Sequence, residues 1–407
     1  MAERPTFLIV GASLAGAKAA ETLREEGFDG HVVLVGAEPH RPYERPPLSK
    51  DYLQDRADRD SVYVHPEGLY AAQEIELIRG REVTAIDLGA RTATLGDGES
   101  LGWDRLLLTT GSEPRRLPIP GADLDGVHVL RTLDDCDRLR ELIAAGGRLV
   151  VIGAGWIGAE VAASARTRGM EVTVVEQQSV PLQTVLGSEV GGMYAEVHRE
   201  HGVELLTGTG VEAIEGDGRA ERVVIEGGRA VDCAAVLIGV GAAPRTQLAE
   251  AAGLAVDNGV LVNATLRAEG DVFAAGDVAN AEHPFFGRRV RVEHWANALN
   301  QGPAAARAML GRTEPYERLP YFFSDQYDVG MEYSGLAEPD AEIVVRGDLA
   351  AREAVVFWLG DDGAVTAGMN INIWDVNEQV QALIRSRAAV DRARLADSDV
   401  PIESLTG

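Results

Sequence analysis

The feature that most constrains this chain is a glycine-rich turn, Gly153–Gly158, between an apolar strand pattern at 149–152 and a helical pattern at 160–168. Strand, tight turn and helix in this order form a dinucleotide-binding unit, because glycines let the backbone approach a pyrophosphate at the helix N-terminus. Glu176 ends the next strand pattern, about 20 positions on, where the motif requires an acid. Its carboxylate accepts hydrogen bonds from a ribose 2′-hydroxyl and repels a 2′-phosphate, so the sequence favours NADH over NADPH.

A second turn of the same kind lies near the start of the chain. The apolar run 7–10 leads into Gly11–Gly16, and a helical pattern follows. Gly11 lets the chain turn tightly and Gly16 lets the helix pack against the strand, but Ser13 replaces the middle glycine. Taken alone, this copy is also compatible with an ordinary strand–helix turn that binds nothing. Two such units within 407 residues predict two or three domains.

Composition excludes several classes of function. The net charge of −26 argues against a nucleic-acid partner. The two cysteines, Cys136 and Cys233, are far apart, which argues against a disulfide framework, a zinc or iron–sulfur site and a redox dithiol. His198 and His201 are expected on a surface helix without a metal. No apolar run approaches the roughly 20 residues of a membrane span and no signal peptide fits, so a cytoplasmic protein is expected.

Three further stretches carry polar groups in informative places. The proline-rich loop 39–50 is rigid and holds Lys50, one of only two lysines, so it is either a ligand wall or a surface loop. The strand pattern at 271–275 stops at Gly276-Asp277, where the carboxylate either reaches a ribitol or ribose hydroxyl or forms an Asx turn. Beyond Pro320, aromatic residues and short strand patterns predict a third, α+β domain.

The second nucleotide unit is inserted between Thr110-Gly111 and Gly276-Asp277, and this arrangement resembles the flavoprotein reductases with two dinucleotide-binding domains. Within that group the chain is similar to the FAD-dependent ferredoxin and rubredoxin reductases. The strings Arg-Pro-Pro-Leu-Ser-Lys at 45–50 and Ser-Asp-Gln-Tyr at 324–327 are specific to that likeness. The resemblance implies an α/β fold with two Rossmann-like domains and a C-terminal α+β domain.

It also implies a domain division. Residues 1–113 and 242–318 would form a discontinuous FAD-binding domain, 114–241 the NAD-binding domain, and 319–407 a C-terminal interface domain.

The resemblance assigns site residues as well. FAD would contact Gly11, Ser13, Ala15, Gly16, Ala37, Arg45, Lys50, Val83, Thr110, Gly111, Arg131, Gly276, Asp277 and Trp295. NADH would contact Gly153, Gly155, Trp156, Ile157, Gly158, Glu176 and Gly241. Lys50 and Glu160 would pair beside the flavin, tuning charge and fixing the nicotinamide rather than acting as acid and base.

Two departures from the wider group matter. Many relatives place a glutamate at the end of the second strand to hold the FAD ribose, whereas here the acid, Glu38, falls later. Disulfide-reducing and oxidase relatives carry cysteine in the loop that reads 45–50 here, and neither cysteine of this chain lies there. Thiol chemistry is therefore not expected.

The expected function is electron transfer from NADH through FAD to a small acidic iron–sulfur protein, a [2Fe-2S] ferredoxin that feeds an oxygenase. A local arginine patch would meet that partner, with candidates Arg288, Arg289, Arg291 and Arg307. Two alternatives stay open: an NADH oxidase-like flavoprotein, and a flavin-bound interaction protein switched by its redox state. No metal and no membrane partner is expected, and the sequence leaves monomer or weak dimer undecided.

Overall fold

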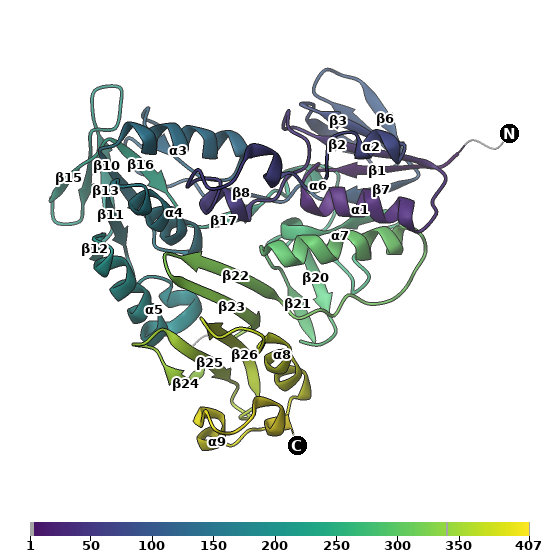
Figure 1. Cartoon of the computed structure of the whole chain (residues 1–407). Helices are drawn as coiled ribbons and strands as arrows, with labels where there is room; N and C mark the ends of the chain where they lie inside the picture. The colour runs from purple at the N-terminus through teal and green to yellow at the C-terminus, as the bar shows by residue number, and fades with distance from the viewer. Residues whose placement is uncertain (1–3, 339–340, 407) are drawn as a thin grey trace. The chain divides into compact units, whose positions relative to one another are not determined.

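The computed structural model describes residues 4–338 and 341–406 and divides the chain into two compact units (Figure 1). The first unit comprises Met1–Arg45, Asp58–Glu113 and Ala242–Pro320. The second comprises Pro46–Ala57, Pro114–Gly241 and Tyr321–Gly407. The short segment that carries Lys50 thus belongs to the second unit.

The first unit is built on a five-stranded parallel sheet in the order β19-β7-β1-β2-β3. Its strands are β1 (Thr6–Val10), β2 (His31–Gly36), β3 (Ile75–Arg79), β7 (Arg105–Leu108) and β19 (Val272–Ala274). The central strand β1 pairs in parallel with β2 and β7, and its residues from Phe7 onward are buried. Burial on both faces explains why these strands read as continuous apolar runs.

Helices α1 (Leu14–Glu25) and α7 (Trp295–Met309) lie side by side in this unit although they are far apart in sequence (Figure 1). Gly302 of α7 allows the approach, because a Cβ there would stand 2.3 Å from the carbonyl oxygen of Ala15. The smaller elements are α2 (Leu69–Ala72), α6 (Gln247–Ala251), η2 (Arg59–Val62), η3 (Gly276–Val278), β4 (Val83–Asp87), β5 (Thr92–Leu95), β6 (Ser100–Gly102), β8 (Ser112–Pro114), β17 (Ala242–Pro244), β18 (Val260–Val262), β20 (Ala279–His283) and β21 (Arg288–Val290).

The second unit contains another parallel sheet, in the order β12-β11-β10-β16-β9. Its strands are β9 (Val127–His128), β10 (Arg148–Ile152), β11 (Glu171–Glu176), β12 (Glu204–Thr207) and β16 (Ala235–Ile238). Its helices are α3 (Leu133–Ala145), α4 (Trp156–Thr167) and α5 (Gln183–Glu200), and Pro46–Ser49 forms the 3-10 helix η1. A small antiparallel sheet consists of β13 (Val211–Glu215), β14 (Arg222–Ile225) and β15 (Ala230–Asp232).

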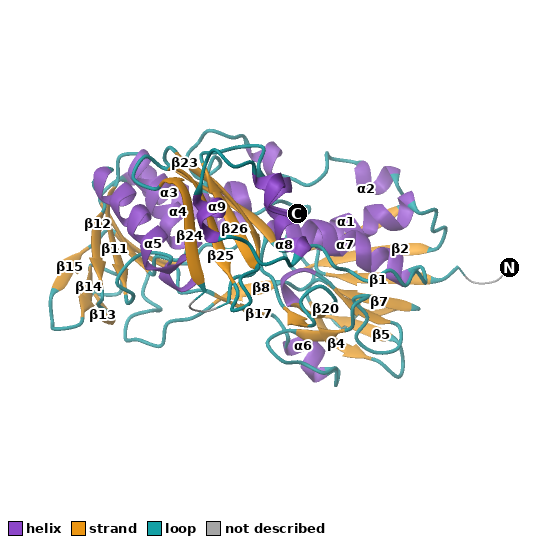
Figure 2. Cartoon of the chain, turned by 90° about the horizontal axis from the view of Figure 1, so that it is seen from below, coloured by secondary structure: helices purple, strands orange, loops and turns teal. Residues whose placement is uncertain are grey.

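The C-terminal part of the second unit is a five-stranded antiparallel sheet, ordered β22-β23-β26-β25-β24. Its strands are β22 (Tyr321–Gln326), β23 (Val329–Gly335), β24 (Glu342–Asp348), β25 (Glu353–Leu359) and β26 (Val365–Ile371). Helix α8 (Asn377–Ser386) contacts β23 and β26, and α9 (Arg392–Ala396) contacts β24; the 3-10 helix η4 (Ile402–Thr406) ends the chain (Figure 2). Apolar residues of α5 and of this sheet form one hydrophobic cluster, which joins the sheet to the rest of its unit.

The predicted fold class is confirmed: two parallel α/β sheets and a C-terminal antiparallel sheet are present. The short strand patterns expected beyond Pro320 correspond to the strands β22–β26, and the helices α8 and α9 follow them. Among the helices of residues 4–338 and 341–406, none combines the length and apolar character needed to cross a membrane.

Candidate functional site

In the glycine-rich turn of the second unit, Gly153 and Gly158 are required for steric reasons, whereas Gly155 is not. Gly153 has φ +96°, and a Cβ on Gly158 would stand 2.0 Å from the carbonyl oxygen of Gly153. A Cβ on Gly155, by contrast, would meet no described atom within 4 Å. Gly155 is the N-cap of α4, and within the described residues no side chain caps that end and no acid lies in the first turn. The helix therefore presents backbone N–H groups beside open space, which suits an anion.

Glu176 faces this turn from the end of β11. Its Oε2 accepts a hydrogen bond from the Ala154 backbone N–H at 2.7 Å, and its Oε1 accepts one from the Gln178 N–H at 2.8 Å. The two backbone donors hold the carboxylate at the position predicted for ribose recognition.

The other residues expected at NADH lie around the same turn or close to the sheet. The Trp156 ring packs edge-on against Phe322 at 4.9 Å between centroids, whereas Ile157 is 44% exposed at the start of α4. Gly241 has φ +102°, and its carbonyl accepts a hydrogen bond from the Arg115 N–H at 2.9 Å. Trp156 thus has a packing role of its own, and Ile157 is the apolar side chain available to a ligand.

The glycine-rich turn of the first unit has the same backbone plan. Gly11 has φ +120°, and a Cβ on Gly16 would stand 2.1 Å from the Gly11 carbonyl oxygen. At the middle position, Ser13 Oγ accepts a hydrogen bond from the Arg45 guanidinium. Arg45 also lies 3.6 Å from Glu38, whose other carboxylate oxygen accepts a hydrogen bond from Tyr43 Oη at 2.5 Å. The displaced acid is therefore held by side chains of its own loop.

The pair Gly276-Asp277 follows β19 in the same unit. Gly276 has φ +79° and donates its N–H to Gln301 Oε1 at 2.9 Å. Asp277 is 8% exposed, and its Oδ2 accepts a hydrogen bond from Ser112 Oγ at 2.8 Å. Sequence reasoning missed Gln301 and Ser112, which hold this turn from positions distant in the chain.

The turn at Gly11–Gly16 and the pair Gly276-Asp277 fit a site that binds FAD. Within the described residues no side chain caps the N-terminus of α1, and its first turn contains no acid. Helix α3 shows the contrast, because Thr132 and Asp135 form a complete capping box there. An uncapped helix N-terminus behind two close-packed glycines suits a pyrophosphate, and buried Asp277 offers a carboxylate for hydroxyl groups.

The remaining residues predicted at FAD divide between the two units. Thr110 Oγ1 donates to the Arg245 carbonyl at 2.9 Å, and the Arg245 N–H donates to the Gly111 carbonyl at 2.9 Å, so both have structural partners. Arg131 belongs to the second unit, where its N–H donates to Asp135 beside the capping box. Three others lie in the first unit: Ala15 is buried in α1, Val83 is buried at the start of β4, and Ala37 is exposed after β2.

Trp295 is the first residue of α7 and is half-buried. Burial raises the pKa of the neighbouring Glu44 carboxyl, and Trp295 and Lys18 partly oppose that rise.

Lys50 and Glu160 form a buried ion pair within the second unit. Lys50 Nζ lies 2.7 Å from Glu160 Oε2, and their side chains are 12% and 5% exposed. Two serine hydroxyls complete the carboxylate shell: Ser49 Oγ donates to Oε2 at 2.5 Å and Ser324 Oγ donates to Oε1 at 2.7 Å. A buried carboxylate is tolerated when such partners satisfy it. The pairing proposed from the sequence is present, and the serines are additional.

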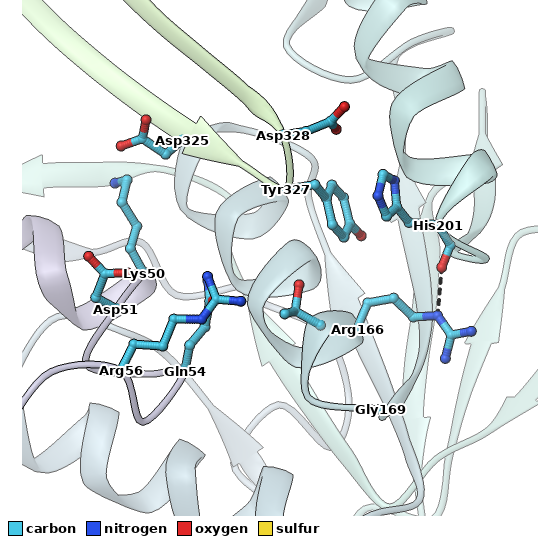
Figure 3. Close-up of a pocket in the computed structure, with 11 residues that line it drawn as sticks. Lys50, Asp51, Gln54, Arg56, Arg166, Gly169, His201, Asp325, Tyr327 and Asp328 are labelled. Atoms are coloured by element: carbon cyan, nitrogen blue, oxygen red, sulfur yellow. Dashed lines mark hydrogen bonds between the residues drawn. The ribbon is translucent and has the colours of Figure 1, made fainter.

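A pocket of about 630 Å³ adjoins Lys50 (Figure 3). Its wall includes three cations, three carboxylates and a stacked ring pair, namely Lys50, Arg56, Arg166, Asp51, Asp325, Asp328, His201 and Tyr327. Asp325 and Lys50 both line this pocket (Figure 3). Burial raises the pKa of the Asp325 carboxyl, Lys50 partly lowers it, and Glu160 raises it further.

The expectation of a surface helix at His198 and His201 is wrong for His198. His198 is 1% exposed, and its Nε2 lies 2.9 Å from Gln326 Oε1. Burial lowers the pKa of His198 to about 4, so the ring is neutral near pH 7. His201 stacks on Tyr327 instead of pointing into solvent. Within residues 4–338 and 341–406, no cluster of His, Cys, Asp and Glu has the arrangement of a metal site.

The arginines proposed as a docking patch are largely neutralised by neighbours. Arg289 lies 2.8 Å from Glu282, Arg307 lies 2.8 Å from Glu26, and Arg291 lies 2.5 Å from Glu293. These pairs reduce the local positive charge on which the patch hypothesis depends.

Residues 5–302 match the family described as pyridine nucleotide-disulphide oxidoreductase. The chain belongs to this family. Residues 321–406 also match the reductase C-terminal domain, which corresponds to the antiparallel sheet and its helices.

Relatives match this family member over its whole length. Putidaredoxin reductase of Pseudomonas putida is 37% identical over 405 residues, covering 98% of this chain and 96% of the relative. The ferredoxin–NAD(+) reductase component of the anthranilate 1,2-dioxygenase system of Burkholderia cepacia is 38% identical over 403 residues, covering 98% of each. The crystal structure of the covalent putidaredoxin reductase–putidaredoxin complex matches with a TM-score of 0.94 at 37% identity, covering 99% of this chain and 98% of that one.

Despite the family's name, the thiols of this member are unsuited to disulphide chemistry. Cys136 is fully buried and its thiol donates to the Leu48 carbonyl at 3.1 Å. Burial raises the pKa of Cys136 to about 12 and that of Cys233 to about 11. Reactive cysteines need a lowered pKa, so neither thiol is an activated nucleophile.

Proposed function

We propose that this protein is an NADH-dependent, FAD-containing ferredoxin reductase of an oxygenase system. The proposal rests on two dinucleotide-type turns. Only the turn at Gly153–Gly158 has open space beside its middle residue, Gly155, and a carboxylate, Glu176, at the end of the following strand. Full-length similarity to ferredoxin reductases of oxygenase systems supports a ferredoxin as the electron acceptor.

FAD, when bound, accepts a hydride from NADH and returns electrons singly to a one-electron acceptor. In this proposal Gly11, Ser13, Ala15, Gly16, Arg45, Gly276 and Asp277 hold FAD in the first unit, and Ala37, Val83, Thr110, Gly111 and Trp295 border it. The α1 N-terminus receives the pyrophosphate, and Arg45 adds a cation beside Ser13. Lys50 and Arg131, which the resemblance assigns to FAD, belong to the second unit.

Residues of the second unit bind the nicotinamide cofactor. Gly153, Gly155 and Gly158 let its pyrophosphate approach the N-terminus of α4. Glu176 accepts hydrogen bonds from the ribose hydroxyls. Trp156, Ile157 and Gly241 border the cofactor. Lys50 and Glu160 need not exchange a proton with substrate. Glu160 holds the buried Lys50 ammonium in place, and this cation favours negative charge that develops beside it.

The proposal extends to the domain division and the setting. Residues 1–113 and 242–318 form the FAD-binding domain, 114–241 the NAD-binding domain, and 319–407 the C-terminal interface domain. The acceptor is a [2Fe-2S] ferredoxin in the cytoplasm. Cysteine-based oxygen reduction has little support, because the thiol of Cys136 is buried and its pKa is raised.

A reconstituted electron-transfer assay tests this function. The FAD-loaded protein is mixed with NADH and cytochrome c, with and without a purified [2Fe-2S] ferredoxin, while oxygen is monitored. We expect cytochrome c reduction that depends on ferredoxin and little oxygen uptake. Rapid oxygen uptake without ferredoxin would support the oxidase alternative, and a reduced flavin that persists without turnover would support a redox-switched interaction protein.

A further inference from the structure

The Ser324 hydroxyl that reaches Glu160 is itself held by a second layer of polar groups. Ser324 and Gln326 are two residues apart on β22, so their side chains lie on the same face of the strand. Gln326 Nε2 donates to Ser324 Oγ at 3.4 Å, and Gln326 Oε1 lies 2.9 Å from His198 Nε2. Ser324, Gln326 and His198 are each 1% exposed, so bulk water does not satisfy these groups.

The chemistry of the donor groups fixes the direction of each of the three hydrogen bonds from His198 to Glu160. Gln326 Oε1 can only accept, so His198 must carry its hydrogen on Nε2. The Nδ1 atom agrees, because it is buried without a partner within the described residues. The Ser324 hydroxyl has a single hydrogen; since it accepts from Gln326, that hydrogen is directed to Glu160 Oε1. All three donors therefore point toward the carboxylate.

We propose that Ser324, Gln326 and His198 are positioning residues, a buried chain of donors that fixes the Glu160 carboxylate and, through it, the Lys50 ammonium. This inference rests on the proposed function, in which the Lys50–Glu160 pair acts beside the bound cofactors. It assigns a role to three residues that touch neither cofactor in the proposed site.

A second carboxylate near Lys50, that of Asp325, explains why fixing the position of Glu160 matters. Asp325 lines the same pocket as Lys50 (Figure 3), and Lys50 partly lowers the pKa of its carboxyl. Phe323 adds an aromatic ring 5.5 Å from Lys50 Nζ. The Lys50 ammonium thus pairs with Glu160 and also interacts electrostatically with a second carboxylate, Asp325. Donors on Glu160 keep that carboxylate in place, which holds Lys50 on the Glu160 side.

The test uses the full-length, FAD-loaded protein and buried variants with a matched control. Ser324→Ala and Gln326→Leu remove the first two donors, and His198→Phe keeps a ring while removing the third. Ser324→Thr restores a hydroxyl. Ser334→Ala is the control, because Ser334 is 0% exposed on the neighbouring strand β23 and its Oγ donates to Asn377 instead.

Anaerobic single-turnover kinetics separate positioning from binding. We expect Ser324→Ala and Gln326→Leu to slow flavin reduction by NADH about tenfold and His198→Phe about threefold, with the NADH Kd changed less than about twofold. Ser324→Thr stays within about threefold of wild type and Ser334→Ala is unchanged. Equal losses in Ser324→Ala and Ser334→Ala, or a loss confined to the NADH Kd, would overturn the proposal.

A spectroscopic arm decides the same question without turnover. Isotope-edited infrared difference spectra between wild type and Glu160→Gln, with ¹³C-labelled glutamate, isolate the Glu160 carboxylate stretch. We expect Ser324→Ala and Gln326→Leu to shift that band and Ser334→Ala to leave it in place; an unmoved band in the first two contradicts the proposal. Absence of flavin reduction by NADH in the wild type would instead reject the proposed function, while the infrared result still decides the donor chain.

Discussion

At the turn of the first unit, Ser13 and Arg45 fill the space that stays open beside Gly155 in the second. The backbones are otherwise alike: a Cβ on Gly16 or on Gly158 would come within 2.1 or 2.0 Å of the carbonyl oxygen of the turn's first glycine. The acids differ as well, because side chains hold Glu38 whereas the backbone N–H groups of Ala154 and Gln178 hold Glu176. In the proposed function, one backbone design thus serves both a permanently held cofactor and one that comes and goes.

The largest effect should come from the glycines that the two turns share. Gly16→Ala and Gly158→Ala each place a methyl group against backbone, which must move, so we expect the free energy of unfolding to fall by about 3 kcal/mol. Thermal denaturation and cofactor content measure this. Gly155→Ala is the control, because it has open space and φ −72°, and should leave the melting temperature unchanged. Equal destabilisation by all three variants would break the comparison.

The next largest effect is the difference in cofactor affinity expected on neutralising the two acids, Glu176 and Glu38. Glu176→Gln removes the charge that the Ala154 and Gln178 N–H groups orient, and we expect the NADH Kd to rise about tenfold, equal to about 1.4 kcal/mol. Glu38→Gln should change FAD affinity less than about threefold, since Tyr43 and Arg45 already occupy that carboxylate. Fluorescence titration gives both constants. A larger effect at Glu38 than at Glu176 would reverse the roles assigned to the two acids.

The middle positions can be exchanged. Gly155→Ser makes the second turn resemble the first, and we expect the NADH Kd to rise about fivefold because the new side chain occupies the open space, with stability unchanged within about 0.5 kcal/mol. Titration and thermal melts of the same preparation separate the two quantities. Unchanged NADH binding would mean that the space beside Gly155 is not used by the cofactor.

The smallest effect is expected from the reverse exchange. Ser13→Gly supplies the missing glycine of the first turn, but it also removes the hydroxyl that accepts a hydrogen bond from Arg45. We expect FAD affinity to change less than about twofold and stability to fall by about 0.5 kcal/mol through the added chain entropy. Flavin retention during dialysis and thermal melting check this. A large gain in affinity would show that Ser13 is a defect rather than part of the cradle.

The parts of the molecule that sequence predicted well depend on local patterns. The apolar runs at β1 and β10, the glycine turns after them and Glu176 at the end of β11 all fall within two short stretches. The Lys50–Glu160 pair could be predicted because one of only two lysines in an arginine-rich chain stood out and the resemblance supplied its partner.

What the sequence did not predict consists of contacts between distant segments. Ser112 with Asp277 is separated by 165 residues and Ser324 with Glu160 by 164. One signal was present and overlooked: His198 follows Val190, Tyr194 and Val197 at helical spacing, which places it on the buried stripe of α5. Its partner Gln326 could not be found that way, because strand alternation identifies a face but not what packs against it.

In the proposed function, the turn at Gly153–Gly158 binds NADH with Glu176 on its ribose, and the turn at Gly11–Gly16 binds the flavin that NADH reduces. Anaerobic titration of the FAD-loaded wild type with NADH and separately with NADPH, followed by the visible absorbance of the flavin, tests it most directly. We expect stoichiometric loss of that absorbance with NADH and a half-saturating NADPH concentration at least about tenfold higher. Reduction by NADPH at equal or lower concentration, or no reduction by NADH, would contradict the account.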